Sequence, residues 1–264
     1  MIFEQIRNAT IRLTYGGKTF LVDPWLAPKG ALGSFDDLGE GAAVRPEQAA
    51  LKMPLCDLPQ PVSEILAGVD AYIITHIHVD HIDQNLAGGT CGAPLDKTVL
   101  TFVQSDDDRA VLEKSGFQRV QVLSSHGSTC GSVTLIKTPG RHGTEQPCGP
   151  ASGVIFQATG ERTVYVAGDT IFYEGVAKTL QQYEPDVIIT NNCAAELGGF
   201  GRLIMDDGDM AEIGRLCPDA TLIASHMDTV AHATLTRETL REKLVARGMA
   251  GRVRIPADGE QYDL

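Results

Sequence analysis

The sequence has no apolar run approaching the ~18 residues that a helix needs to cross a bilayer. It is also poor in basic residues, with 22 lysines and arginines against 34 aspartates and glutamates, for a formal net charge of −12. Proteins that hold nucleic acid usually present a basic face to the phosphates, and no such cluster occurs here. We therefore expect no membrane and no nucleic-acid partner, and a small-molecule substrate instead.

Cysteine is sparse and scattered, since the six cysteines form no C-x-x-C pair. This spacing favours reduced, mostly buried thiols over disulfides or a structural zinc cluster. The stretch MIFEQIRNAT lacks the basic start and the apolar stretch of a signal peptide, which predicts a cytoplasmic protein. Asn8-Ala9-Thr10 matches a glycosylation acceptor, but without a secretory signal we give this match no weight.

Short apolar segments bounded by Gly, Pro, Asp or Asn recur along the chain, which is typical of β-strands. They are IRLTY, KTFLVD, DAYIIT, KTVLTFV, RVQVL, SVTLIKT, GVIFQAT, RTVYVAGD, DVIIT, ATLIAS and RVRIP. The YGGK stretch at 15–18 predicts a hairpin turn between the first two. With 43% hydrophobic residues, the chain is expected to form one domain over residues 1–264.

Helical patterns separate many of the later strands. DDRAVLEKSG predicts a helix with Asp106 or Asp107 as N-cap, and residues 205–216 predict another. TRETLREKLVARG predicts a helix with Leu240, Leu244 and Val245 on its buried face. Strands and helices mixed in this way favour two sheets with helices outside them.

Residues 27–68 are rich in glycine and proline and show little periodicity. A loop of this length within a compact domain is usually functional or disordered. Because it precedes a histidine-rich stretch, we interpret it as an insertion that forms a cap near the active site, with a simple surface insertion as the alternative. Deletion of part of 30–55 should then leave a folded protein with altered substrate preference.

Histidine is rare as well, yet three of the seven fall within THIHVDHID at 75–83. His76 and His78 are two residues apart, so on extended backbone they face the same side. Neutral imidazole is the commonest metal ligand in proteins. Asp80 and His81 follow as the chain turns and can serve a second ion. The stretch therefore predicts a metal site.

Several apolar strands end in a side chain that binds metal or forms hydrogen bonds. These side chains are Asp23, His76, His142, Asp169, Asn191 with Asn192, and His226. In α/β proteins, strand ends that meet at one sheet edge are where sites are built. We therefore expect these residues to share one site, in which Asn191 and Asn192 shape the substrate pocket.

THIHVDHID, TPGRHG, VAGDT and ASHMD, in this order, resemble the metallo-β-lactamase superfamily of metal-dependent hydrolases. FLVDPWL and IPADGE resemble more specifically its branch that includes the ascorbate-6-phosphate lactonases. The resemblance covers essentially the whole chain except residues 27–68. It implies an α/β fold, a four-layer αβ/βα sandwich of two mixed β-sheets with helices outside and the site at one edge.

The same resemblance implies a centre of two divalent metal ions. One ion would be bound by His76, His78 and His142, the other by Asp80, His81 and His226, with Asp169 bridging them. Asp23 would accept the N–H of a ligand imidazole and so fix its tautomer. These nitrogen and oxygen ligands suit Zn²⁺, with Mn²⁺ or Fe²⁺ as alternatives.

Two ions about 3.5–4 Å apart can share a water and lower its pKa towards about 7, which gives a nucleophilic hydroxide. The resemblance thus predicts a hydrolase of a small-molecule ester, first a lactone and second a small phosphodiester. Alternatives of another class are an iron-dependent oxidoreductase and a non-catalytic metal-binding protein. A homo-oligomer is also possible.

Two residues are candidates for catalytic roles, Asp80 and His232. His232 lies six residues after His226, and we interpret it as a general acid or a substrate contact. An exposed histidine at a helix start is the alternative. His126, in SSHGS, is interpreted as an ordinary loop residue.

Overall fold

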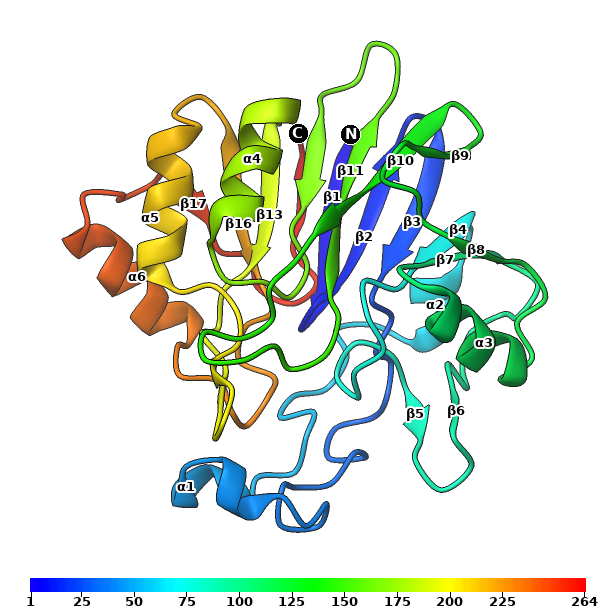
Figure 1. Ribbon diagram of the computed structural model, residues 1–264, viewed down its shortest axis with the longest axis vertical. Coiled ribbons are helices and arrows are strands. Elements are labelled where there is room, and N and C mark those ends of the chain that lie inside the picture. Colours follow the sequence, from blue (N-terminus) through cyan, green and yellow to red (C-terminus); the bar gives the residue numbers. More distant parts are fainter.

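A computed structural model describes all residues, 1–264, and shows two seven-stranded sheets packed face to face (Figure 1). The first sheet has the order β18-β1-β2-β3-β4-β7-β8 and the second β17-β16-β13-β12-β11-β10-β9. The strands of the first are β1 Ile2–Arg7, β2 Thr10–Tyr15, β3 Lys18–Val22, β4 Ala71–Ile73, β7 Leu100–Val103, β8 Val120–Val122 and β18 Gln261–Asp263. Those of the second are β9 Ser128–Cys130, β10 Val133–Pro139, β11 Ser152–Gln157, β12 Val164–Val166, β13 Val187–Asn191, β16 Thr221–Ser225 and β17 Val253–Arg254.

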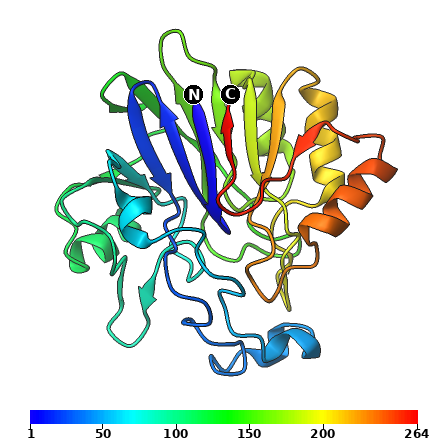
Figure 2. The same ribbon diagram turned by 180° about the vertical axis from the view of Figure 1, so that it is seen from behind.

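Helices cover the outer face of each sheet, on opposite sides of the molecule (Figures 1 and 2). The first sheet carries α2 Val62–Leu66 and α3 Asp106–Lys114. The second carries α4 Glu174–Tyr183, α5 Asp207–Leu216 and α6 Arg237–Ala246. The predicted four-layer α/β sandwich is therefore confirmed. No helix combines the length and apolarity needed to span a membrane.

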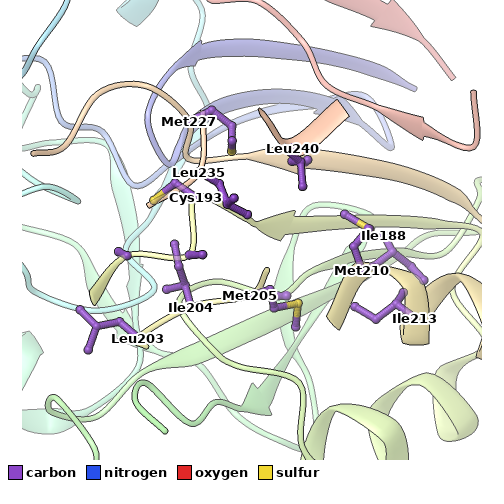
Figure 3. Close-up of a cluster of buried hydrophobic side chains, with 14 of the residues drawn as sticks. Ile188, Cys193, Leu203, Ile204, Met205, Met210, Ile213, Met227, Leu235 and Leu240 are labelled. Atoms are coloured by element: carbon purple, nitrogen blue, oxygen red, sulfur yellow. The ribbon is translucent and has the colours of Figure 1, made fainter. Parts of the chain in front are cut away.

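Three apolar clusters fill the spaces between the four layers. Between the sheets, Phe20 and Phe156 meet edge to face with ring centroids 5.3 Å apart. Strand β13 serves two clusters, because Val187 and Ile189 point between the sheets while Ile188 points to the outer helices. Figure 3 shows Ile188 beside Met210 and Ile213 of α5. Full burial of each such side chain contributes roughly 1.5–3 kcal/mol.

The parallel parts of the two sheets bring the site residues together. Strands β3, β4, β7 and β8 are parallel neighbours, as are β12, β13, β16 and β17. Their carboxyl ends lie at the lower edge of the sandwich in Figure 1. Two short hairpins approach the same edge, β5 Gln84–Asn85 with β6 Thr90–Cys91, and β14 Glu196–Leu197 with β15 Gly201–Arg202.

All the predicted strands are present, and the predicted turn joins β2 to β3 through Gly16 and Gly17, both at positive φ. Strands β1, β9 and β18 of the two sheets and the four strands of the short hairpins, β5, β6, β14 and β15, were not predicted. Two helix details were wrong. Helix α3 is capped by Ser105, whose hydroxyl accepts the Asp108 N–H, and not by Asp106 or Asp107. Val245 is 59% exposed, because it is turned away from the buried side of α6.

The part of residues 27–68 with the 3-10 turn Gly41–Ala43 and α1 Pro46–Ala49 extends below the sheets, whereas α2 lies against the first sheet (Figure 1). Phe35 and Met53 in this segment are buried and join the outer cluster of the second sheet. Met53 also pairs with Gly33 as an isolated β-bridge. A deletion within 30–55 that removes these anchors should therefore destabilise the fold, and tolerance of a deletion elsewhere in this stretch stays a prediction.

Candidate metal centre

Seven buried or half-buried histidines and aspartates converge where the strands end. They form three groups whose ligand atoms lie within 4.8 Å of one another: His76, His78 and His142; His76, His81 and Asp169; and Asp80, His81 and His226. Asp169 lies between the first and third groups. Its Oδ2 is 3.2 Å from His81 Nε2 and 3.8 Å from His142 Nε2, and its Oδ1 is 4.0 Å from His226 Nε2. The structure thus brings together every residue predicted to bind metal.

Unusual backbone geometry positions three residues that follow strands: Asp23, Asp169 and His226. Asp23 directly follows β3 with φ 45°, and His226 directly follows β16 with φ 63°. Such left-handed geometry costs free energy in residues other than glycine and is often found at functional sites. Before Asp169 stands Gly168, where a Cβ would lie 2.5 Å from the Ser152 carbonyl oxygen. The glycine of VAGDT is therefore required for the chain to turn here.

Each of three histidines has a partner at Nδ1, which leaves Nε2 directed into the site. His81 Nδ1 lies 2.9 Å from Asp23 Oδ2, His142 Nδ1 lies 3.2 Å from the Leu203 carbonyl oxygen, and His226 Nδ1 lies 3.5 Å from Cys193 Sγ. Asp23 is itself held by the N–H and the hydroxyl of Thr75, both at 2.7 Å. Partners of this kind orient metal-binding imidazoles. Asp23 therefore lies where it can accept the N–H of His81 and fix the tautomer of that ligand, as predicted.

The donor atoms fit a divalent cation. His81 Nε2 is buried and makes no well-aligned hydrogen bond, although Asp169 Oδ2 lies 3.2 Å away and three carboxylates surround the ring. Imidazole nitrogen and carboxylate oxygen are the ligands of Zn²⁺, Mn²⁺ and Fe²⁺ sites. A cation at this position would satisfy the unpaired nitrogen and offset the clustered negative charge.

The histidines of the metal-free protein differ in charge. Burial lowers the pKa of His76 and His142, and it lowers the pKa of His78 to about 4. Burial also opposes a charge on His81, but Asp169, Asp23 and Asp80 outweigh it and raise that pKa to about 10. His81 therefore holds a proton at neutral pH, which a metal ion must displace.

Metal uptake by the metal-free protein at pH 8 is expected to release at least one proton per chain, because the pKa of His81 lies above this pH. Release should decline as the pH rises through about 10, where the imidazole is already neutral. Calorimetric titration with Zn²⁺ in buffers of different protonation enthalpy measures the proton count. Zinc binding at pH 8 without proton release would contradict this assignment of charge.

A cavity of about 400 Å³ opens beside the centre. Its apolar lining comes from residues 27–68, from the metal-binding loop and from the two hairpins: Leu32, Phe35, Leu38, Met53, Ile77, Val79, Leu86 and Leu197. Its other lining residues are Glu40, His78, Asp80, Gln84, Cys148 and His232. The lining contains no lysine or arginine, so the cavity offers no cationic side chain to an anionic substrate.

His232 lies in the wall of this cavity. Its ring packs edge-on against Phe35, with centroids 5.4 Å apart, and its Nδ1 is buried without a hydrogen-bond partner in the chain. The alternative of an exposed helix-start histidine is therefore wrong. Burial lowers the pKa of His232 to about 4, so the imidazole is neutral at pH 7. This charge state favours a substrate contact over a general acid.

Asn191, the last residue of β13, and Asn192 do not line the cavity, so their predicted substrate contact needs correction. Asn191 donates its amide to Asp169 Oδ1 at 2.6 Å and so positions that carboxylate. Asn192 has no exposed surface and donates to the Asp206 carbonyl oxygen at 3.0 Å. Alternation along the strand could have separated them, since adjacent residues point to opposite faces.

Three residues at the site were missed: Asn8, Cys148 and Cys193. Cys148 lines the cavity, and Cys193 contacts His226. Asn8 is fully buried and contacts both Asp80 and His226. The only available signal for Asn8 was its position, an asparagine in a short polar break between two apolar segments, which is typical of a turn.

Comparison with known proteins agrees with this geometry. Residues 18–227 match the beta-lactamase superfamily domain, and the chain belongs to this superfamily. Over 99% of both chains it is 36% identical to the UPF0173 protein YddR of Bacillus subtilis (strain 168), which places it among the UPF0173 proteins. Relatives in this group are named metal-dependent hydrolases, and the chain is a metal-dependent hydrolase of the same family.

Two solved structures are similar over nearly their whole length. The isothiocyanate hydrolase from Delia radicum gut bacteria has a TM-score of 0.89 and 35% identity, with 100% of this chain and 99% of that one covered. A possible metal-dependent hydrolase from Veillonella parvula DSM 2008 has the same TM-score, 34% identity and the same coverage. The narrower likeness to ascorbate-6-phosphate lactonases stays a prediction.

Proposed function

We propose that this chain hydrolyses small, uncharged isothiocyanates with apolar substituents. The observation that supports this is the cavity beside the metal centre, which is mostly apolar and has no lysine or arginine in its lining. An isothiocyanate has a compact electrophilic carbon and no charge, so it needs no cationic contact. The similar isothiocyanate hydrolase gives independent support for this substrate class.

The reaction adds one water to the substrate, R–N=C=S + H₂O → R–NH₂ + COS. The water oxygen bonds to the central carbon, the carbon–nitrogen bond breaks, and the two water protons end on the amine nitrogen. We propose two zinc ions, one held by His76, His78 and His142, the other by Asp80, His81 and His226, with Asp169 shared. Such ions lower the pKa of water and polarise an electrophile.

Asp80 and His232 would act on the substrate side of the centre. Asp80 lines the cavity and its carboxylate is ionised, because His81 and His226 outweigh burial and hold its pKa well below the usual range. It can therefore accept a hydrogen bond from the attacking water and orient it. His232, neutral at pH 7, can donate or accept a hydrogen bond at the substrate nitrogen.

The apolar residues of the segment 27–68 would hold the substituent. Phe35 and Met53 are buried, whereas Leu32 and Leu38 are half-buried in the cavity wall. Enclosing the substituent excludes water from the reacting carbon and strengthens each polar contact there. In this proposal the segment would act as the cap that its composition suggested.

A lactone with an apolar side chain is the second candidate, because it is also uncharged and needs no cationic contact. A phosphodiester suits the cavity less well, since no lysine or arginine is present to pair with the phosphate. An ascorbate-6-phosphate substrate is disfavoured for the same reason.

The test is a substrate panel run with zinc-reconstituted protein: benzyl isothiocyanate, an alkyl lactone and a small phosphodiester. We expect benzylamine and carbonyl sulfide in equal amounts, with kcat/KM for the isothiocyanate well above the others. Lactone hydrolysis without amine release would support the second candidate instead. Metal analysis separates the classes, since two zinc or manganese ions favour hydrolysis and one iron in a coloured protein favours redox chemistry.

Glu40 is expected to reject anionic substrates at the mouth of the cavity. Glu40 is exposed and lines the cavity. Burial raises the pKa of the Cys148 thiol, and the charges of Asp80, Asp169 and Glu40 raise it further, so the charge of Glu40 is felt near the centre. Glu40→Gln should raise kcat/KM for a carboxylated benzyl isothiocyanate about 3–10-fold, which corresponds to roughly 1 kcal/mol for a solvent-screened charge. The uncharged benzyl compound serves as the control and should be unaffected. Equal effects on both compounds would show that charge is not what Glu40 contributes.

A further inference from the structure

Asn8 connects the two halves of the sandwich at the metal centre. It lies in the turn between β1 and β2 of the first sheet, has no exposed surface, and has φ 54°. Its carbonyl oxygen accepts the His226 N–H at 3.0 Å, at the end of β16 in the second sheet. Its side-chain Nδ2 donates to the Asp80 carbonyl oxygen at 2.9 Å and lies 3.3 Å from His226 Nε2. One residue therefore contacts both Asp80 and His226.

Neither the turn nor the packing requires an amide at this position. Glycine adopts positive φ without steric cost, so the turn alone would accept it. Burying an amide is costly unless it is fully hydrogen-bonded, and Asn8 Oδ1 has no hydrogen-bond partner in the chain. The contacts of Asn8 Nδ2 with Asp80 and His226 explain why a buried amide occurs at this position despite its cost in free energy.

We propose that Asn8 is a positioning residue for the Asp80, His81 and His226 side of the metal centre. Its amide holds the backbone of Asp80 and, in the metal-free protein, lies within hydrogen-bond distance of His226 Nε2, so the two ligands keep a fixed separation. Asp80 Oδ2 and His226 Nε2 lie 3.2 Å apart, close enough to converge on one ion. The ligands His76, His78 and His142 have no hydrogen bond to Asn8 and should be unaffected. The inference depends on the proposed two-metal centre and not on the substrate.

The test is the zinc affinity of Asn8→Gly, measured by competition with a chromophoric chelator and by metal analysis. Glycine keeps the positive φ and the carbonyl contact to His226, and removes only the amide. We expect one ion to bind as in the wild type and the other to bind about 10–100-fold more weakly, the usual effect of losing such a partner. Glu184→Gly is the matched control, because Glu184 is exposed, lies at the end of α4 and also has positive φ, 43°.

Two results would overturn the proposal: unchanged affinity for both ions, or equal weakening of both. Thermal unfolding of the metal-free variants checks that the fold is kept. If Asn8→Gly does not fold, Asn8→Asp takes its place, since aspartate tolerates this backbone but cannot donate to the Asp80 carbonyl oxygen. Because it also brings a negative charge beside His226, it should change the affinity for that ion alone, and normal binding of both ions would reject the proposal. If the wild-type chain binds only one ion, the two-metal centre is rejected. The proposal for Asn8 is then tested by whether Asn8→Gly weakens the binding of that one ion.

Discussion

Asp169→Ala is expected to bind at most one metal ion and to lose activity by a factor on the order of 10⁴ or more, as for groups that act as a unit. Asp169 is 4% exposed, and its carboxylate lies between the two ligand groups, within 4.0 Å of His81, His142 and His226. Its removal takes a shared anion from both sides of the centre. It also leaves only two carboxylates, those of Asp23 and Asp80, to stabilise the protonated imidazole of His81.

Metal analysis of the purified variant decides this prediction, alongside a thermal unfolding curve. Asn191→Ala is the informative companion, because Asn191 donates to Asp169 Oδ1 but is not itself a predicted ligand. It should keep both ions with an affinity lowered about 10–100-fold. Full occupancy of both ions in Asp169→Ala would show that Asp169 does not bridge them.

Four of the ligand residues, His76, His142, Asp169 and His226, could be predicted because each closely follows a strong strand signal. A strand such as RTVYVAG is apolar on both faces, so the polar residue that follows it is placed at the sheet edge by the fold itself. The motif with three histidines supplied the chemistry, and the resemblance supplied the grouping. The strands of the two sheets were predicted for the same reason, namely their local apolar character.

Residues whose role depends on distant contacts could not be predicted in this way. Strand β1 pairs with β18 at the other end of the chain, and its sequence IFEQIR alternates only in part. Asn8 acquires its role from Asp80 and His226, which are 72 and 218 residues away in sequence. The capping of α3 by Ser105 was a local signal that was overlooked, since serine is among the best N-cap residues.

The cap illustrates a third case, in which composition predicted the place but not the anchoring. Glycine and proline in residues 27–68 indicated an irregular segment near the site, and the structure puts it against the cavity. Its attachment depends on single apolar residues in an aperiodic stretch. Two backbone hydrogen bonds also connect it to distant loops: the Gly198 N–H donates to the Ala43 carbonyl oxygen at 2.7 Å, and the Leu55 N–H donates to the Thr229 carbonyl oxygen at 2.8 Å. No sequence pattern predicts such bonds.

His226→Ala and His232→Ala are expected to differ sharply, although the two residues are six apart. His226 follows β16 directly and faces Asp80, so its removal should cost one ion and nearly all activity. His232 faces the cavity, so His232→Ala should keep both ions and lose about 10²–10³-fold in kcat, the usual cost of one preorganised hydrogen bond to the reacting group. Metal content and kinetics on benzyl isothiocyanate are measured together.

The pH profile then tests the charge of His232. Burial puts its pKa at about 4, below the ordinary 6.5, so the imidazole is neutral above about pH 5 and gains its proton only on acidification. The kcat/KM profile of His232→Ala should therefore keep the wild-type shape above pH 5, at a lower level. A general acid would instead give the wild type an alkaline decline that the variant lacks. His126→Ala, at an exposed loop histidine, is the control and should behave as the wild type. Loss of an ion from His232→Ala would mean that the ligands are wrongly assigned, and unchanged rates would make His232 a bystander.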